Sequence, residues 1–239
     1  MIADGDDGGG AAGAGRRRMI HGRRRGRKLR AGQAGLMATL LPRLRLELAE
    51  NATLDPAAPF GPEFRRFALE IGFGAGEHLA AEAAAHPETG FLGVEIYENG
   101  VARLLAEIAA QGLGNIRLVI DDARLVLAAL PAASLDAVYI LFPDPWPKLR
   151  HQKRRLVAPA TLAQLARAMR PGAELRLASD DMEYARDMLA DALAVPAFRW
   201  LARRADDWRQ RPADWPPTRY EAKARKADRR PLYLRFVRR

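Results

Sequence analysis

The chain has 239 residues, of which 49% are hydrophobic and none is cysteine, and it carries a net charge of +10. This length holds one α/β domain with a proper core and a modest extension, and no apolar run approaches the roughly 18 residues that a membrane helix needs. The absence of cysteine excludes disulfides, zinc–thiolate sites and cysteine nucleophiles. The four histidines, His21, His78, His86 and His151, show no metal-ligand spacing. We therefore expect a cytoplasmic protein without a membrane segment, a metal or an obligate protein partner.

The charge is distributed unevenly along the chain. Residues 1–30 carry nine Lys or Arg against three Asp or Glu, and residues 199–239 carry fourteen against five. The middle, residues 31–198, is acidic, with sixteen against twenty-one. A globular core flanked by two polyanion-binding segments fits this pattern, which makes nucleic acid the leading partner. The alternative is that the arginines serve solubility in a composition rich in Ala, Arg and Gly.

The chain is predicted to begin with a basic extension. Residues 1–15 are rich in Gly, Ala and Asp, and residues 16–30 add nine basic residues with little apolar content. Such a composition cannot build a core, so we expect residues 1–33 to be disordered on their own. Residues 34–239 are expected to form one domain, which opens with leucines at helical spacing that Pro42 interrupts.

Short apolar runs then alternate with amphipathic segments. Strands are expected at residues 67–71, 90–94, 116–120, 135–141 and 173–178, helices at residues 77–85, 99–111, 123–130, 155–169 and 182–193, and two closing strands at residues 198–200 and 232–237. Strands that alternate with helices at this spacing imply parallel βαβ units. The predicted fold is α/β, a doubly wound and mostly parallel seven-stranded sheet with helices on both faces.

The first strand runs into a glycine loop. Gly72, Gly74 and Gly76 follow Glu70 at alternate positions, and a helix opens at Glu77. Such glycines let the backbone turn tightly and approach a ligand, while the helix amino terminus lends partial positive charge. The spacing differs from the dinucleotide fingerprint, and Glu70 would repel a pyrophosphate. Glu70 would instead suit the ammonium of S-adenosylmethionine (SAM), whose carboxylate can still take the loop amides.

Acids also follow the next two strands. Glu95 lies about 20 residues beyond the glycines, where a carboxylate grips a ribose diol. Asp121 and Asp122 follow the third strand, where one can accept from the adenine amine and its neighbour can cap the next helix. We choose Asp122 as the ligand and leave Asp121 open. Acids after three successive strands, together with the glycine loop, favour SAM over NAD.

A proline-rich loop follows the fourth strand, with the sequence Phe-Pro-Asp-Pro-Trp-Pro-Lys at residues 142–148. Three prolines in five residues cannot continue a strand, so this segment must be a shaped loop that holds Asp144. The loop leads into a basic run that can neutralise RNA phosphates or form a solvated helix start. Its members are Lys148, Arg150, Lys153, Arg154 and Arg155. Trp146 can stack on a splayed base or pack in the core.

Taken together, these motifs resemble the bacterial tRNA (guanine-N7-)-methyltransferases, a family of class I SAM-dependent, Rossmann-like methyltransferases. The resemblance covers roughly residues 34–239, and the Pro-Asp-Pro-Trp block is its most specific part. It implies methyl transfer from SAM to N7 of a guanosine in the tRNA variable loop. It also implies roles for individual residues: Glu70, Glu95, Asp122 and Asp144 at the SAM site, with Asp144 also the active-site acid; Lys148, Asp180, Thr218, Arg219, Tyr220 and Glu221 at the substrate; and the run after Lys148 at the RNA.

Two departures from the family pattern bear on the guanine pocket. Asp181 stands where the family more often has an aromatic residue, and residues 218–221 read Thr-Arg-Tyr-Glu where Thr-Lys-Phe-Glu is common. Asp180 or Glu221 can accept from the guanine N1–H and amine. The alternative for Asp180 and Asp181 is a helix N-cap before Met182.

The expected chemistry needs no proton removal, because guanine N7 has a free lone pair. Alignment is then the main catalytic task, and a carboxylate such as Asp144 can stabilise the cationic product ring. Two other classes remain open: a SAM-dependent enzyme that acts on another RNA base or a small molecule, and a noncatalytic RNA-binding protein on the same fold.

Overall fold

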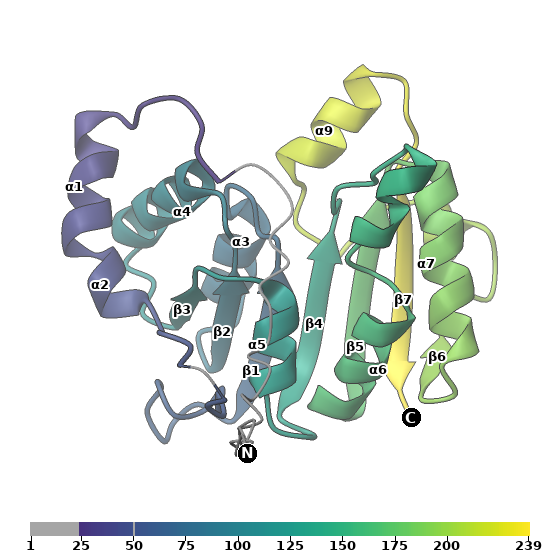
Figure 1. Ribbon diagram of the computed structural model, residues 1–239, viewed down its shortest axis with the longest axis horizontal. Coiled ribbons are helices and arrows are strands. Elements are labelled where there is room, and N and C mark those ends of the chain that lie inside the picture. Colours follow the sequence, from purple (N-terminus) through teal and green to yellow (C-terminus); the bar gives the residue numbers. More distant parts are fainter. Residues whose placement is uncertain (1–23, 50) are drawn as a thin grey trace, which may run out of the picture.

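The computed structural model describes residues 24–49 and 51–239 (Figure 1). Its centre is a seven-stranded sheet with the order β3-β2-β1-β4-β5-β7-β6. The strands are β1 (Arg66–Ile71), β2 (Thr89–Val94), β3 (Ile116–Val119), β4 (Leu135–Leu141), β5 (Met169–Ser179), β6 (Phe198–Trp200) and β7 (Leu232–Arg238). The first five are parallel, and β7 is antiparallel to both β5 and β6. The predicted doubly wound, mostly parallel sheet is confirmed.

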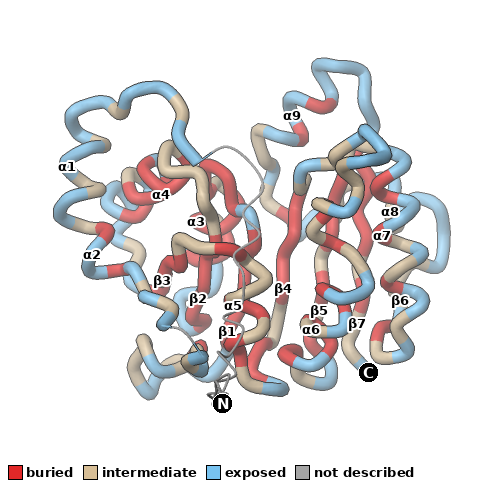
Figure 2. The backbone as a smooth tube through the Cα atoms, in the orientation of Figure 1, coloured by how far each residue is buried: buried red, intermediate tan, exposed pale blue. Residues whose placement is uncertain are grey.

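Helices cover both faces of the sheet. One face carries α3 (Glu77–Ala85) and α4 (Glu98–Gln111), and the other carries α5 (Ala123–Ala129), α6 (Pro159–Ala168) and α7 (Met182–Ala194). Successive strand residues alternate between these layers, so that Leu69 packs toward α5, α6 and α7 while Ala68 packs toward α3 and α4. The strands are therefore buried on both sides (Figure 2), as a parallel sheet requires.

The amino-terminal segment lies against α4. Helices α1 (Ala31–Thr39) and α2 (Leu41–Leu44) replace the interrupted helical stripe, with Pro42 in the first turn of α2. Ahead of them, Gly26 N donates to Asn99 Oδ1 at 2.6 Å, and Asn99 Nδ2 donates to the Arg27 carbonyl at 2.6 Å. Of residues 1–33, which are expected to be disordered on their own, residues 1–23 lie outside the described residues, whereas residues 24–33 contact α4 and include the start of α1.

The helix predicted at residues 155–169 is wrong at both ends. A 3-10 helix, η1 (Leu149–Arg154), comes first, and α6 begins only at Pro159, a residue suited to a first helical turn. The residues between them are held by tertiary contacts, for example Val157 N, which donates to Tyr184 Oη at 2.9 Å. Strand β5 starts earlier than predicted, at Met169, and its register with β4 shifts between Leu135 and Ala137.

Two short helices were not predicted in the carboxyl-terminal segment: α8 (Asp206–Arg209) and α9 (Arg219–Lys226). In Figure 1, α9 lies above the arrowhead end of β4. Across residues 24–49 and 51–239, no helix is long and apolar enough to span a membrane, and no group of three His, Asp or Glu side chains is arranged to hold a metal ion.

Candidate active site

A cavity of about 340 Å³ opens at the carboxyl ends of the parallel strands. It lies where the strand order reverses between β1 and β4, the crevice in which open α/β sheets bind ligands. Its volume is within the range of small-molecule sites. The lining brings together several predicted site residues: Gly72, Gly74, Glu95, Asp122, Asp144 and Tyr220, with Asp121 beside them.

The glycine loop after β1 has left-handed backbone at each predicted glycine. Gly72, Gly74 and Gly76 have φ angles of 72°, 58° and 81°, a region that other residues enter only with strain. A Cβ at Gly74 would lie 2.9 Å from the Tyr220 ring, and a Cβ at Gly100 of α4 would lie 2.0 Å from the Gly74 carbonyl oxygen. The loop is therefore held between α9 and α4 at contact distance.

Glu95, at the end of β2, fixes the far side of this loop. One carboxylate oxygen accepts from Gly74 N at 2.8 Å, and the other accepts from Ile96 N at 2.7 Å and Tyr97 N at 3.0 Å. Burial raises the pKa of Glu95, and the charge of Asp144 adds to the shift. The predicted ribose ligand thus faces the cavity with a carboxylate that its backbone neighbours hold in place.

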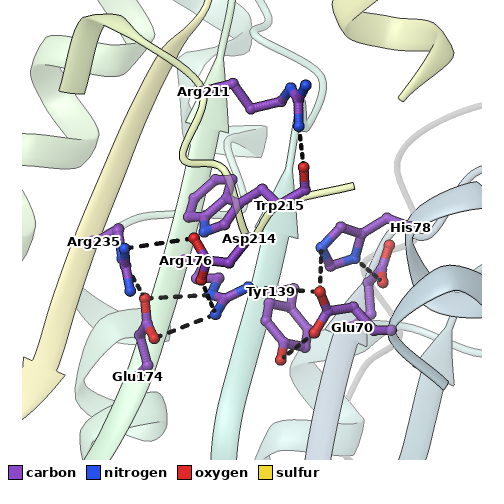
Figure 3. A network of polar contacts seen from close by, with 10 residues as sticks. Glu70, His78, Tyr139, Glu174, Arg176, Arg211, Asp214, Trp215 and Arg235 are labelled. Atoms are coloured by element: carbon purple, nitrogen blue, oxygen red, sulfur yellow. Dashed lines mark hydrogen bonds and ion pairs between the residues drawn. The ribbon is translucent and has the colours of Figure 1, made fainter. Parts of the chain in front are cut away.

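Glu70 lies elsewhere. Its side chain is buried, and it pairs with His78 Nδ1 at 2.7 Å (Figure 3). It does not line the large cavity but a smaller one beside it, to which Gly72 and Tyr220 also contribute. The two cavities therefore meet at the glycine loop, with Glu70 on the side away from Glu95.

The structure shows which of the two acids after β3 caps the next helix. Asp122 caps α5 by accepting from Arg124 N at 2.9 Å, and Asp121 Oδ1 accepts from Asp122 N at 2.8 Å. Both line the cavity. The capping role belongs to Asp122, while its choice as the adenine ligand stays a prediction.

The proline-rich loop after β4 forms another wall of the cavity. Phe142 and Trp146, on either side of the Pro-Asp-Pro segment, have φ angles of 53° and 45°, which is strained for aromatic residues and is typical of functional loops. Asp144 is exposed between them and lines the cavity. The Phe142 ring stacks on Tyr220 with centroids 6.4 Å apart, and the Arg154 guanidinium lies 5.0 Å from the Trp146 ring.

Arg155 has a role different from the RNA contact predicted for it. Its side chain is only 5% exposed, so it has little surface to offer a phosphate. Nε donates to the Pro145 carbonyl at 2.8 Å, Nη2 donates to Glu183 at 2.9 Å, and Nη1 pairs with Asp187. The guanidinium also lies 4.9 Å from the Tyr184 ring. Arg155 therefore ties the proline-rich loop to α7.

The rest of the basic run stays accessible. Lys148, Arg150 and Lys153 are exposed, and Arg154 is half-buried against Trp146. These residues lie on and beside η1, directly after the proline-rich loop.

The predicted substrate residues near the carboxyl terminus are held by structural contacts. Thr218 caps α9 by accepting from Glu221 N at 3.2 Å. Glu221 is buried and pairs with Arg225 at 2.7 Å and with Arg211 at 3.2 Å. The Arg219 guanidinium lies 5.1 Å from the Tyr220 ring. Of these side chains, Tyr220 is the one that lines the cavity.

Asp180 and Asp181 have different contacts, and only Asp181 caps a helix. Asp181 caps α7 by accepting from Tyr184 N at 2.8 Å, so the N-cap alternative falls to Asp181. Asp180 accepts from Arg229 Nε at 2.7 Å and is 24% exposed. Its carboxylate is free of capping but has an arginine partner.

Comparison with known proteins identifies the chain's relatives. Residues 65–233 match a family model described as "Putative methyltransferase". The tRNA (guanine-N(7)-)-methyltransferase of Rhodospirillum rubrum is 52% identical over 92% of this chain and 88% of its own length. That of Rhizobium meliloti is 49% identical over 91% of this chain and 94% of its own length. The chain belongs to the bacterial tRNA (guanine-N7-)-methyltransferase family.

Solved structures agree on the fold of this family member. The 16S rRNA (adenine(1408)-N(1))-methyltransferase from Catenulisporales acidiphilia is 22% identical, with a TM-score of 0.51, over 80% of this chain and 95% of that one. The aminoglycoside resistance methyltransferase NpmB1 is 19% identical, with a TM-score of 0.51, over 74% of this chain and 89% of that one. At this identity, the likeness establishes the methyltransferase fold.

The protein is a SAM-dependent methyltransferase, and the large cavity fits the cofactor. Gly74, in the loop after β1, donates its amide to the Glu95 carboxylate at the end of β2, and Asp121 and Asp122 follow β3. A Cβ at Gly72 would meet nothing within 4 Å, which leaves space for a ligand at the loop. These groups would hold SAM with its adenosine between Glu95 and the acid pair.

Sequence reasoning missed three parts of this site. Gly100 is needed for the contact between α4 and the glycine loop. Arg155 hydrogen-bonds the Pro145 carbonyl, and His78 hydrogen-bonds Glu70. A glycine within a predicted amphipathic helix is a usable signal for Gly100. The partners of Arg155 and His78 are set by tertiary packing and leave no local sequence signal.

The affinity for SAM is expected to weaken as the pH is lowered, because Glu95 then becomes protonated. Ribose hydroxyls donate to the ionised carboxylate, whose pKa is raised above its ordinary value of 4.5. Affinity is therefore full well above that pKa and is lost as the pH falls through it, by up to about tenfold per pH unit. Calorimetric titration with SAM from about pH 8 to about pH 5 measures this slope. The Glu95→Gln variant should bind SAM weakly at every pH, and a slope that survives in it would assign the titration to another acid.

Arg155→Lys is expected to lower kcat about 10- to 100-fold, because one ammonium cannot replace the planar fork that joins the Pro145 carbonyl to Glu183 and Asp187. The affinity for SAM should change little, since Glu95 and the glycine loop stay intact. Steady-state kinetics and calorimetry separate the two quantities. Arg186→Lys, an exposed position on the same helix α7, is the matched control. A kcat for Arg155→Lys equal to that of the control would contradict the positioning role.

Proposed function

We propose that this protein transfers the methyl group of SAM to N7 of the guanosine at position 46 in the tRNA variable loop. The observation that carries the proposal is the exposed Asp144, held by a strained proline-rich loop at the SAM cavity, directly ahead of the basic helix η1. The names of the relatives support the same reaction.

The chemistry requires alignment more than proton transfer. SAM supplies an electrophilic methyl group on a sulfonium, and guanine N7 offers a lone pair without losing a proton. Asp144 is placed to stabilise the positive charge that develops on the guanine ring. Three features fix that carboxylate: left-handed backbone at Phe142 and Trp146, the prolines between them, and the Arg155 bond to Pro145. A fixed carboxylate avoids reorganisation during the reaction.

Guanine selection is assigned to Asp180, Glu221 and the residues around Thr218. A carboxylate that accepts from the guanine N1–H and amine would be left unpaired by adenine, and this penalty gives selectivity for guanine. Both acids have arginine partners, Arg229 for Asp180 and Arg225 for Glu221. Lys148 and Arg219 are assigned to the nucleotide that carries the base.

The tRNA backbone is assigned to the exposed cations beside the cavity. Arg150, Lys153 and Arg154 of η1 lie on one side, and the basic segment at residues 24–30 lies against α4 near Tyr97, which lines the cavity. Cations on two sides of a cavity can neutralise phosphates that flank a base inserted between them. A cytoplasmic location and action without an obligate protein partner fit a tRNA-modifying enzyme, and we infer both.

Methylation of defined transcripts tests the reaction. The protein is incubated with methyl-labelled SAM and an unmodified tRNA transcript, and the labelled nucleoside is identified by chromatography and mass spectrometry. We expect label in 7-methylguanosine, and none in a transcript whose variable-loop guanosine is replaced by adenosine. Asp144→Asn should lower kcat by about 100-fold or more, as the loss of a preorganised electrostatic group does.

The other outcomes discriminate between the remaining classes. Label in another nucleoside would keep the cofactor site but reject the guanine assignment. No label, with SAM binding intact, would favour a small-molecule substrate or a noncatalytic RNA-binding protein.

The double charge reversal Arg150→Glu with Lys153→Glu is expected to weaken tRNA binding and to reduce the salt dependence of log Kd by roughly one per lost phosphate contact. Filter binding across a salt series measures both. The matched control is Arg199→Glu. Arg199 is exposed on β6, in register with Glu174 through β7, and so lies at the opposite end of the sheet from the cavity. Equal effects of the two changes would mean that η1 attracts RNA only through net charge.

A further inference from the structure

His78 occupies the first turn of α3, immediately after the glycine loop, and its side chain is only 2% exposed. Its Nδ1 lies 2.7 Å from Glu70 Oε2, and that carboxylate is 4% exposed at the end of β1. The contact joins the residue before the loop to the residue after it. It therefore closes the nine-residue segment 70–78, which contains the three left-handed glycines of this loop.

The imidazole is also held from its other side. Its ring meets the Tyr139 ring edge-on with centroids 4.9 Å apart (Figure 3). On the same side, Nε2 lies 3.9 Å from Glu82 Oε1. Tyr139 donates its hydroxyl proton to Glu82 Oε2 at 3.1 Å. Burial raises the pKa of Tyr139, so its hydroxyl remains a donor.

The second carboxylate of this cluster has a further partner. Arg176 of β5 lies 3.6 Å from Glu82 Oε1, and its guanidinium lies 5.3 Å from the Tyr139 ring. Glu82 is thus held by Tyr139 and Arg176 and leaves His78 facing Glu70. The ring of His78 has little freedom to rotate, because β1, β4 and α3 contribute the three groups that contact it.

We propose that His78 is a positioning residue for SAM binding, which holds the Glu70 carboxylate and the glycine loop in the geometry that receives the cofactor's ammonium group. The proposal rests on the assignment of Glu70 to the SAM site. A carboxylate accepts only, so Nδ1–H of His78 donates to it. The other carboxylate oxygen then serves the ammonium from the small cavity that Glu70 and His78 both line. Without this donor, a buried carboxylate lacks its partner and turns toward another one.

Two substitutions of similar polarity distinguish the contribution of His78 Nδ1 from that of Nε2. The amide of Asn reaches the place of Nδ1, whereas the longer Gln places its amide near Nε2. His78→Asn is therefore expected to retain SAM affinity within about threefold, and His78→Gln to weaken it about tenfold, as the loss of one charge-assisted hydrogen bond does. Calorimetric SAM binding without tRNA gives both values, so this test stands even if the tRNA assignment fails.

The control is His86→Gln, at the exposed end of the same helix α3, where no change in SAM affinity is expected. With tRNA as substrate, His78→Gln should raise the KM for SAM while the KM for tRNA stays the same. Equal SAM affinity for wild type, His78→Asn and His78→Gln would overturn the proposal. Equal losses in the two variants would overturn it as well.

A double-mutant cycle tests whether His78 acts through Glu70. Glu70→Gln alone should weaken SAM binding, and adding His78→Gln should then cost less than about twofold, because the partner is already lost. Additive losses would overturn the proposal. SAM affinity unchanged by Glu70→Gln would instead remove Glu70 from the site.

A measurement on the unmutated protein decides the matter if His78→Gln does not fold. Nitrogen-15 labelling of histidine should give a downfield, exchange-protected Nδ1–H resonance for His78, and SAM should shift it while leaving His86 unchanged. A resonance that SAM does not move would overturn the proposal.

Discussion

The left-handed backbone after β1 and β4 is the constraint on which the cavity depends. Adjacent parallel strands end side by side, and each must turn away before its next helix. After β1 the turn is built from glycines, and it places the Gly74 amide where it donates to the Glu95 carboxylate. After β4 it is built from Phe142 and Trp146 around two prolines, which leaves Asp144 exposed. One loop therefore holds Glu95 at the cavity, and the other holds Asp144 there.

Left-handed aromatic residues cost free energy, on the order of 1–3 kcal/mol each, so the surrounding structure must hold them. Arg155 does so for the loop after β4 by joining the Pro145 carbonyl to two carboxylates of α7. The loop after β1 is held between Gly100 of α4 and Tyr220 of α9. The ring of Tyr220 also stacks on Phe142, so the two loops share one support.

The fold is predictable from this sequence because strand and helix patterns are local and repeat along the chain. The glycine loop, Glu95 and Asp144 are predictable for the same reason, since the carboxyl ends of parallel strands meet at one edge. What fails is the choice of partners for long polar side chains. Arg155 reads as one more cation in a basic run, yet tertiary packing buries it; Asp122 reads as a ligand, yet it also caps α5. The helix expected from Arg155 starts at Pro159 because residues 155–158 are committed to contacts with α7 and the loop.

Burial of charge explains why the site can be both rigid and charged. Water would screen the ion pairs and let the long side chains move, so exposed pairs fix little. The pairs of Arg155 and of Glu221 each have one member almost fully buried, where breaking one partner is costly. Their cost in desolvation is offset only if every donor and acceptor has a fixed position. The cations that we propose to contact RNA obey the opposite rule. Arg150 and Lys153 are exposed, and a hydrated, mobile charge can adjust to the phosphates of a bound RNA.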